Sequence, residues 1–503
     1  MRQGFRWYDC LIIILFFYLL VLQIQAIWPF TIDDMYISLR YARNWAAGDG
    51  LLWNLDSPPV EGYSNFSFVA LGALSLLLNS NPVFIFKAAG FIGLLCTCYF
   101  LYCLSRFWFA KREALIPCII LLLYKGQIIW AVSGLETTVY QALICGSVYY
   151  IFRGLGYVLY PGMRGSIQKG SFIFAGLLLS LAGLTRPEAP AFMMLFFILI
   201  CWDRPAAQAK QHWSGIVCFV ATLLIFYLPY FLWRLHYYGF LFPNSVYCKA
   251  FSESFTYELD LNYLRLVWPF ALFAILACIK AQDKRHYFLW LPSVIYLLLL
   301  RDADPVVAFD NRLFLPAFVL LIPLAFKGLA EIIFIFSTKR TEYELFALYF
   351  VLFVLLGLFM PSMTLSQYRH FSENPVCGEQ LRFSVLSWLN EHSQPGNKVV
   401  LADAGMIPYF SQLHFIDSYC LNNLAMSHYP DKSRYEEFCH RILNEKPNII
   451  ILTSLLKEGK VIYTPGDACL KILLSNQSGY KLSKTLSAVS PESEYRYEMF
   501  TDF

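Results

Sequence analysis

Long apolar runs alternate with short polar segments along the chain from Met1 to about Met360. A helix needs about 20 residues to cross the hydrocarbon core of a bilayer, so runs near this length predict membrane-spanning helices. Several runs are shorter, and their ends are therefore approximate. The eleven expected spans are Leu11–Trp28, Pro82–Leu104, Ala114–Val132, Thr137–Phe152, Phe172–Leu184, Ala189–Trp202, Ile216–Trp233, Leu266–Ile279, Tyr287–Leu300, Leu313–Phe326 and Leu345–Met360.

From Ser366 onward, Glu, Asn, Ser, Lys and Pro occur as often as in an ordinary soluble domain. This tail contains short apolar runs of strand length and longer segments with helical spacing. The predicted strands are Val399–Ala402 and Asn448–Leu452, and the predicted helices are Glu379–Glu391 and Ser433–Asn444. We therefore predict a polytopic α-helical membrane domain over residues 1–365, followed by a soluble α/β domain over residues 366–503.

The basic residues predict the orientation of the spans, because Lys and Arg concentrate in cytoplasmic loops. Three apolar stretches separate the first two basic segments, but two cytoplasmic ends require an even number of crossings. The short stretch Phe66–Leu78 is therefore expected to lie along the outer face or dip into it. The N-terminus is then cytoplasmic, with Leu11–Trp28 as an uncleaved anchor, and the soluble domain lies outside. The basic segments are Arg2/Arg6, Arg106/Lys111/Arg112, Arg153/Arg164/Lys169, Arg204/Lys210, Lys280/Lys284/Arg285 and Lys339/Arg340.

The composition narrows the class of protein. Hydrophobic residues make up 58% of the 503 residues and charged residues 15%, whereas soluble domains carry about 25% charged residues. These values exclude a soluble, disordered or fibrous chain and indicate a multi-pass protein in contact with membrane lipids. The formal net charge of +4 is too small to indicate a nucleic-acid partner.

Acids and cations from several outer loops meet at one membrane face in this topology. Ionisable groups near membrane depth are costly and tend to mark functional sites. The cytoplasmic loops show no such mixture. The candidate site residues are Asp33, Asp34, Arg40, Glu61, Tyr63, Asn65, Glu136, Arg186, Glu188, Tyr238, Asn244, Lys249 and Arg312.

Several of these residues also have a purely structural interpretation, which the sequence leaves open. The first acids would begin a helix running through Arg40 to Trp45, and a capped helix end would still hold a catalytic acid rigidly. The structural interpretations are a helix cap for Thr31 or Asp33, a capping box for Ser133 and Glu136, an ion pair for Arg186 and Glu188, and headgroup contacts for Lys249 and Arg312.

A transferase acting outside the cytoplasm needs a donor other than a nucleotide sugar, and a sugar on a polyprenyl phosphate meets that need. Asp33 or Asp34 would take the proton from the acceptor hydroxyl. A divalent cation between these two acids would assist, although their spacing does not require one, and we expect no other cofactor. The cations for the departing phosphate are Arg40, Arg186, Lys249 and Arg312; the substrate-binding candidates are Glu61, Tyr63, Asn65, Glu136, Glu188, Tyr238 and Asn244.

Nine segments of the chain occur in an order that resembles one group of enzymes. They resemble the GT-C superfamily of polyprenyl-phosphate-sugar-dependent glycosyltransferases, and within it the mycobacterial terminal arabinofuranosyltransferase and ZomB-like group. Cys248 and the region 302–311 depart from the pattern of that group. The segments are Asp33–Asn44, Gly50–Asn54, Glu61–Phe66, Ser133–Thr137, Leu184–Glu188, Tyr237–Gly239, Pro243–Lys249, Asn311–Pro316 and Asp403–Asp417.

The resemblance implies a GT-C fold with a juxtamembrane helix at Phe66–Leu78 and a catalytic base at Asp33 or Asp34. It further implies that a sugar, such as the pentose arabinofuranose, passes from a polyprenyl-phosphate donor to a glycan, glycolipid or lipopolysaccharide of the cell envelope. An inverting displacement fits this chemistry. The site would face the periplasm from the inner (plasma) membrane of a bacterium.

Two other functions remain open at this point. A transporter or flippase of lipid-linked sugars would show inverted repeats and broken helices in matching halves, which the sequence does not reveal. A family member that serves as an envelope scaffold is the second, although the first-loop acids are retained.

Ten of the 14 cysteines precede Ser366, mostly inside expected spans, where Cys packs as a small hydrophobe. The other four, Cys377, Cys420, Cys439 and Cys469, lie on the expected oxidising side. They predict one or two disulfides, in any of three full pairings.

Overall fold

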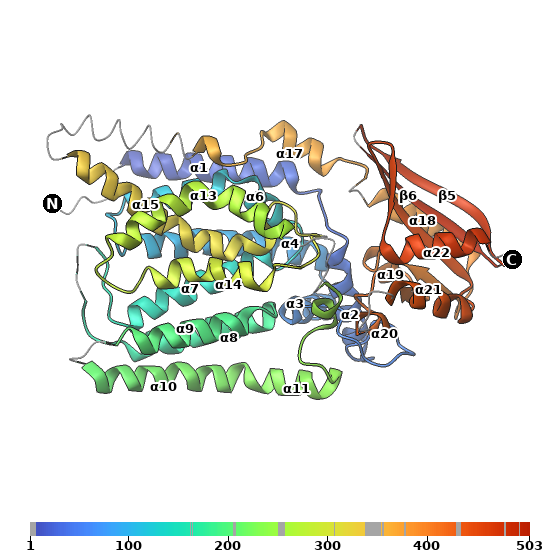
Figure 1. Cartoon of the computed structure of the whole chain (residues 1–503), viewed down its shortest axis with the longest axis horizontal. Helices are drawn as coiled ribbons and strands as arrows, with labels where there is room; N and C mark the ends of the chain where they lie inside the picture. Colours follow the sequence, from blue (N-terminus) through green and yellow to red (C-terminus); the bar gives the residue numbers. More distant parts are fainter. Residues whose placement is uncertain are drawn as a thin grey trace.

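The computed structural model describes residues 7–160, 162, 164–204, 208–249, 257–305, 307–337, 354, 357–376, 379–428, 434–476, 479–491 and 493–502. A bundle of roughly aligned helices forms one part of the molecule. A β-sheet with its own helices forms the other part, at one end of the bundle (Figure 1). The fold therefore consists of the helical part and the sheet part that the change in polarity along the chain predicts.

Apolar helices build the bundle. Within it α7 packs against α4 and α8, α13 against α15, and α8 against α10. Side chains such as Leu94, Ile144 and Phe172 are fully buried between these helices. The bounds are α1 Trp7–Ile27, α4 Pro82–Ser105, α5 Ile116–Leu123, α6 Lys125–Ala131, α7 Thr137–Gly154, α8 Lys169–Thr185, α9 Ala189–Trp202, α10 Ala209–Phe226, α11 Leu228–Tyr238, α13 Glu258–Ile279, α14 Tyr287–Leu299 and α15 Leu315–Ser337.

Four helices in the described residues are long and apolar enough to cross a membrane, and several shorter apolar helices accompany them. The predicted number of eleven spans therefore stays a prediction. Most of the last predicted span, Leu345–Met360, lies outside the described residues. The four long helices are Pro82–Ser105, Ala209–Tyr238, Glu258–Ile279 and Arg312–Ile333.

The segment predicted as the span Ala114–Val132 forms two helical pieces, Glu113–Leu123 and Lys125–Ala131, bent by 76° relative to each other. The two pieces together are long and apolar enough for one broken span or a re-entrant loop, so the span stays a prediction. Tyr124 has an extended backbone with ψ of 115°. The Lys125 amide then donates to the carbonyl of Pro361 at 2.8 Å instead of continuing the helical ladder. A hydrogen bond to the remote carbonyl of Pro361 thus replaces the helical hydrogen bond that the apolar pattern predicts for the Lys125 amide.

Two short helices lie at the end of the bundle that faces the sheet (Figure 1). The first, α2 (Asp34–Ala47), follows α1 directly, and the second, α3 (Phe66–Leu77), coincides with the stretch expected to lie at the outer face. α3 packs against α2 and α4. The approach is close at Gly72, where an added Cβ would lie 3.0 Å from Cβ of Ala42 and 3.1 Å from the ring of Phe86.

The C-terminal part is a six-stranded mixed sheet in the order β2-β1-β3-β6-β5, with β4 paired to β3. β1 runs parallel to β2 and β3, and the remaining pairs are antiparallel. The predicted α/β character is confirmed, with both predicted strands found as β1 and β3 and both predicted helices as α18 and α21. The bounds are α17 Leu365–Ser372, α18 Gln380–His392, β1 Lys398–Leu401, α19 Met406–Phe410, β2 His414–Asp417, α20 Leu424–Ser427, α21 Arg434–Asn444, β3 Ile449–Lys457, β4 Lys460–Tyr463, α22 Pro465–Asn476, β5 Lys481–Val489 and β6 Ser493–Thr501.

Side chains from the start of the chain dock α2 onto the C-terminal part. Thr31 and Tyr36 donate to the carboxylate of Glu379 at 2.5 and 2.6 Å. The guanidinium of Arg43 donates to the carbonyls of Tyr409 and Ser411. These contacts fix the sheet domain relative to the end of the bundle at which α2 lies.

The disulfide prediction is partly wrong. Cys439 pairs with Cys469, with their Cα atoms 6.2 Å apart, but Cys420 pairs with Cys248 of the helical part. The prediction had sought partners only within the tail, because the sequence does not show that residues 248 and 420 meet. Cys377 lies outside the described residues.

The packing of α13 against α15 provides a test of the bundle. A Cβ added at Gly328 would lie 1.8 Å from the carbonyl oxygen of Phe273, so Gly328→Ala forces the two helices apart. Overpacking of this kind costs about 1–3 kcal/mol, which we expect to appear as a lower midpoint of thermal unfolding in detergent. Gly170→Ala is the matched control, because its Cβ meets nothing within 4 Å. Equal midpoints for the two variants would contradict this packing.

Candidate functional site

The two consecutive acids at the start of α2 face different parts of the molecule. Asp33 accepts hydrogen bonds from the backbone amides of Gly405 and Met406, both at 3.0 Å. Asp34 lines a cavity and lies 3.9 Å from the ammonium of Lys249. The structure therefore separates two carboxylates that the sequence treats as a pair.

Asp33 is held by the C-terminal domain. Nε of Arg382 lies 3.0 Å from its carboxylate, and the same guanidinium contacts Asp403 at 3.0 Å. The backbone at Gly405 approaches so closely that an added Cβ would lie 2.1 Å from the carbonyl oxygen of Asp33. Burial raises the pKa of Asp33 to about 6, and the positive charge of Arg382 opposes this effect.

A cavity of about 490 Å³ opens beside Asp34. Its walls come from α2, residues 62–65, the segments before α7 and α9, α12 (Asn244–Lys249), the segment before α15, and Leu421 of the sheet domain. Apolar side chains such as Phe242, Leu300 and Leu313 cover part of the wall. The predicted site residues that line it are Asp34, Tyr63, Asn65, Glu136, Arg186, Glu188, Lys249 and Arg312.

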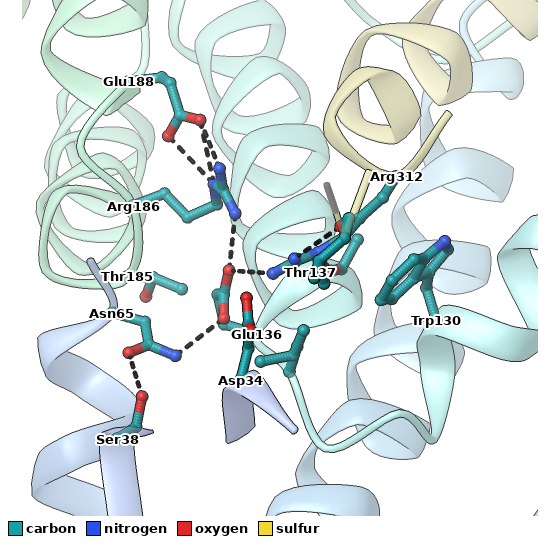
Figure 2. A network of polar contacts seen from close by, with 12 residues as sticks. Asp34, Ser38, Asn65, Trp130, Glu136, Thr137, Thr185, Arg186, Glu188 and Arg312 are labelled. Atoms are coloured by element: carbon teal, nitrogen blue, oxygen red, sulfur yellow. Dashed lines mark hydrogen bonds and ion pairs between the residues drawn. The ribbon is translucent and has the colours of Figure 1, made fainter. Parts of the chain in front are cut away.

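Glu136 is the centre of a polar network at this cavity (Figure 2). Its carboxylate accepts from Asn65 at 2.8 Å, Arg186 at 2.7 Å and Arg312 at 3.1 Å, and the residue is only 1% exposed. Although burial raises the pKa of Glu136, the charges of Arg312 and Arg186 outweigh that effect and lower the pKa. The carboxylate therefore stays charged and orients both guanidinium groups.

The two arginines are also bound by other groups. Arg186 donates to Glu188 through Nε at 3.0 Å and Nη2 at 2.5 Å. Arg312 donates to Thr137 and to the carbonyl of Val307, both at 3.1 Å. By contrast, the ammonium of Lys249 makes its ion pair at 3.9 Å, and the Lys249 side chain is a quarter exposed. Lys249 can therefore shift toward a bound anion more readily than either arginine.

Five predicted site residues do not line the cavity. Asp33 bonds to the sheet domain, as described above. The other four lie behind the residues that line the cavity, where their own contacts bury them. Arg40 donates to the carbonyls of Trp53, Pro408 and Leu413, Glu61 pairs with Arg234 at 2.8 Å, Tyr238 bonds to Tyr63 at 3.0 Å, and Asn244 donates to the carbonyls of Cys420 and Leu421 at 3.1 and 2.8 Å.

The structure decides between several interpretations that the sequence left open. Asp33 occupies the cap position of α2, but its side chain makes no capping hydrogen bond. The capping box at Ser133 and Glu136 is absent, because Glu136 makes no cap bond and instead binds Asn65, Arg186 and Arg312. The local pair of Arg186 and Glu188 is present and belongs to the wider network.

The described residues contain no group of three His, Cys, Asp or Glu side chains placed to hold a metal ion. The carboxylate of Asp33 already accepts from two amides and lies against Arg382. A cation shared by Asp33 and Asp34 would have to displace these partners, so the assignment of both acids to a metal has no support from their contacts.

Sequence reasoning missed several residues that hold the site together. Arg234 has the clearest signal, because it is a lone cation at the end of a strongly apolar run. Arg382 has none, since its partner Asp33 is remote in the sequence. Asp403, which pairs with Arg382, begins the last of the resembling segments but is not among the candidate site residues. Tyr495 and Tyr497, which donate to Asp403, lie still farther along the chain.

Comparison with solved structures identifies the fold. ArnT from Cupriavidus metallidurans, solved with bound undecaprenyl phosphate, aligns with a TM-score of 0.60 at 11% identity, over 96% of this chain and 97% of ArnT. The apo oligosaccharyltransferase of Archaeoglobus fulgidus aligns with a TM-score of 0.59 at 12% identity, over 92% of this chain and 76% of that one. The chain has a GT-C fold.

A mycobacterial arabinofuranosyltransferase, AftD, aligns with a TM-score of 0.50 at 14% identity, over 96% of this chain but only 40% of AftD. A family model described as a domain of unknown function, DUF8728, matches residues 370–500. No curated protein sequence matches the chain significantly. The GT-C likeness thus covers nearly the whole chain, while the sequence match falls on the sheet domain.

The raised pKa of Asp33 predicts a pH-dependent stability. Its pKa of about 6 exceeds the ordinary value of 3.8, so between these values the folded state binds a proton that the unfolded state does not. The contribution of this carboxyl to the free energy of unfolding therefore rises as the pH falls, by about 1 kcal/mol from pH 7 to pH 5. Thermal unfolding at both pH values should show this gain in the wild type but not in Asp33→Asn. An equal change in the thermal stability of both proteins between pH 7 and pH 5 would contradict the raised pKa of Asp33.

Proposed function

We propose that this protein is a membrane glycosyltransferase that transfers a sugar from a polyprenyl-phosphate donor to a glycan or glycolipid of the cell envelope. The observation that carries the proposal is the cavity in which the Asp34 carboxylate, the Lys249 ammonium and the Arg312 guanidinium meet, within a GT-C fold. The ArnT structure of the same fold holds undecaprenyl phosphate, which supports a lipid phosphate as the common part of the donor.

The cavity offers both kinds of surface that such a donor requires. Phe242, Leu300 and Leu313 provide apolar wall for the first prenyl units. Lys249 and Arg312 provide positive charge for a phosphate at the same cavity. A phosphate on a lipid chain matches this combination better than a free sugar phosphate would.

The proposed reaction is an in-line displacement at the anomeric carbon. Asp34 takes the proton of the acceptor hydroxyl, and the acceptor oxygen forms a bond to the anomeric carbon as the bond from that carbon to the phosphate oxygen breaks. The sugar configuration inverts, and polyprenyl phosphate leaves with its negative charge stabilised by Lys249 and Arg312. In this mechanism Glu136 and Glu188 orient the two arginines, and Tyr63 and Asn65 contact the sugar or the acceptor.

The orientation inferred from the basic loops fits this proposal. With the N-terminus in the cytoplasm, the cavity and the domain from residue 366 onward lie on the periplasmic side of the inner membrane. The two disulfides, Cys248–Cys420 and Cys439–Cys469, support the periplasmic placement because disulfides persist in oxidising compartments. The resemblance of the sequence motifs to arabinofuranosyltransferases makes a pentose such as arabinofuranose the first donor sugar to test.

The proposed base makes a direct prediction for activity. Membrane vesicles supplied with synthetic polyprenyl-phosphate arabinofuranose, and in parallel with a hexose donor, should release polyprenyl phosphate, measured by mass spectrometry. Asp34→Asn should lower this rate by about 100-fold or more, because a general base contributes factors of that size. Asp302→Asn is the matched control, since Asp302 is a neighbouring outer-loop acid that pairs with Arg301 and does not line the cavity.

Two outcomes would overturn the mechanism. Full activity in Asp34→Asn would exclude this carboxylate as the base, and full activity in both Asp33→Asn and Asp34→Asn would exclude the acid pair altogether. Movement of the donor across the bilayer without release of polyprenyl phosphate would instead indicate a transporter or flippase of lipid-linked sugars.

The orientation has its own test. Ser366 is exposed near the start of α17, so Ser366→Cys should react with a membrane-impermeant thiol reagent on intact spheroplasts, above the labelling of the wild type. We expect this because the orientation places α17 outside the cytoplasm. Labelling that appears only after permeabilisation would reverse the topology and with it the side of the proposed site.

A further inference from the structure

A disulfide connects the helical part of the molecule to the sheet domain directly beside the proposed site. Cys248 and Cys420 are 172 residues apart in the sequence, and their Cα atoms are 5.8 Å apart, within the range that disulfides require. Cys248 precedes Lys249, and Cys420 precedes Leu421. Both of these following residues line the cavity. Each half of the disulfide is thus one residue away from the cavity wall.

The helix that carries Lys249 is short. α12 covers six residues, Asn244–Lys249, and helices of this length are not stable by themselves in water. Its position therefore depends on what it is attached to. Asn244 at its start donates to the carbonyls of Cys420 and Leu421, and the carbonyl of Lys249 at its end accepts from the amide of Asp304 at 3.1 Å.

The segment that carries Cys420 is held in one conformation from its own side. The carboxylate of Asp417 accepts from the backbone amides of Tyr419 at 2.8 Å, Cys420 at 3.0 Å and Asn422 at 2.8 Å. Cys420 has a φ of +110°, a backbone conformation that residues other than glycine rarely adopt. This turn is a fixed base to which the disulfide can tie α12.

We infer that the Cys248–Cys420 disulfide is a positioning element that holds Lys249 and Leu421 at the cavity, so that binding of the lipid-phosphate donor depends on this bond being formed. The inference rests on the proposed function, because it assigns to Lys249 the contact with the donor phosphate. Without the bond, α12 keeps its polar contacts to the sheet domain and to the amide of Asp304, but its C-terminal end loses the covalent bond that holds it beside Asp34. The phosphate would then lose the most adaptable of its cations.

The second disulfide provides a matched control. Cys439 and Cys469 join α21 to α22 inside the sheet domain, and neither they nor their neighbours line the 490 Å³ cavity. The double variant Cys439→Ser with Cys469→Ser therefore loses a disulfide of the same domain without freeing α12. The test variant is Cys248→Ser with Cys420→Ser.

The experiment measures binding of undecaprenyl phosphate to the purified full chain in nanodiscs. We expect the Cys248/Cys420 variant to bind about tenfold more weakly than the wild type, equal to about 1.4 kcal/mol, and the Cys439/Cys469 variant to bind like the wild type. Dithiothreitol should weaken binding by the wild type and by the control variant, but not by the test variant. In this step each protein disulfide is reduced to two thiols while dithiothreitol is oxidised to its cyclic disulfide.

A second measurement separates this inference from the proposed function. Acetylation of Lys249 by an amine reagent, followed by peptide mass spectrometry, reports the freedom of α12 in the absence of any donor. We expect faster acetylation in the Cys248/Cys420 variant than in the wild type and the control variant. If the wild type binds the lipid but the variant binds equally well, the inference is wrong and the function stands. If the wild type fails to bind, the function is wrong, and equal acetylation rates would overturn the inference as well.

Discussion

A buried carboxylate needs hydrogen-bond donors to compensate for the loss of water. The donors to the Asp33 carboxylate described above all belong to the C-terminal domain. The guanidinium of Arg382 and the amides of Gly405 and Met406 surround it. Removing one partner of such a buried pair leaves an uncompensated charge at a cost of about 3–5 kcal/mol. Asp33, the residue just before α2, is therefore fixed relative to the sheet domain. Because Asp34 is the next residue, its place in the cavity wall follows from the bonds of its neighbour.

The cavity itself combines rigid and adaptable charges. Glu136 and Glu188 hold the guanidinium groups of Arg186 and Arg312 in place, so the proposed mechanism needs little reorganisation when a negative charge develops. The same pairing reduces the positive charge that the arginines present. In the proposed mechanism Lys249, on its short helix, supplies a cation that can follow the donor phosphate. The two arginines therefore have fixed positions in the cavity wall, whereas the ammonium of Lys249 can move toward a bound anion.

The sequence predicts which loops meet, but not which side chains bond. The sorting of basic residues places the loops of Asp34, Glu136, Arg186 and Arg312 at one face, and these residues do line one cavity. Arg40 was assigned to phosphate because a cation on an outer loop looks the same in the sequence whether it binds a phosphate or backbone carbonyls. Its partners include backbone carbonyl groups. Because every residue has such a group, the residue types in the sequence do not indicate this contact. The pairing of Cys248 with Cys420 was hidden for a similar reason, since it depends on where two distant segments meet in space.

The contacts of Asp33 also set an order for the maturation of the chain. Tyr495 and Tyr497 on β6 donate to Asp403, Asp403 pairs with Arg382, and Arg382 pairs with Asp33. Synthesis proceeds from the N-terminus, so the membrane helices are made long before the strand that completes this series. Until residues 382 to 497 have been made, the carboxylate of Asp33 lacks this series of partners. The series of contacts that ends at Asp33 is therefore complete only after β6, which pairs with β3, has been synthesised.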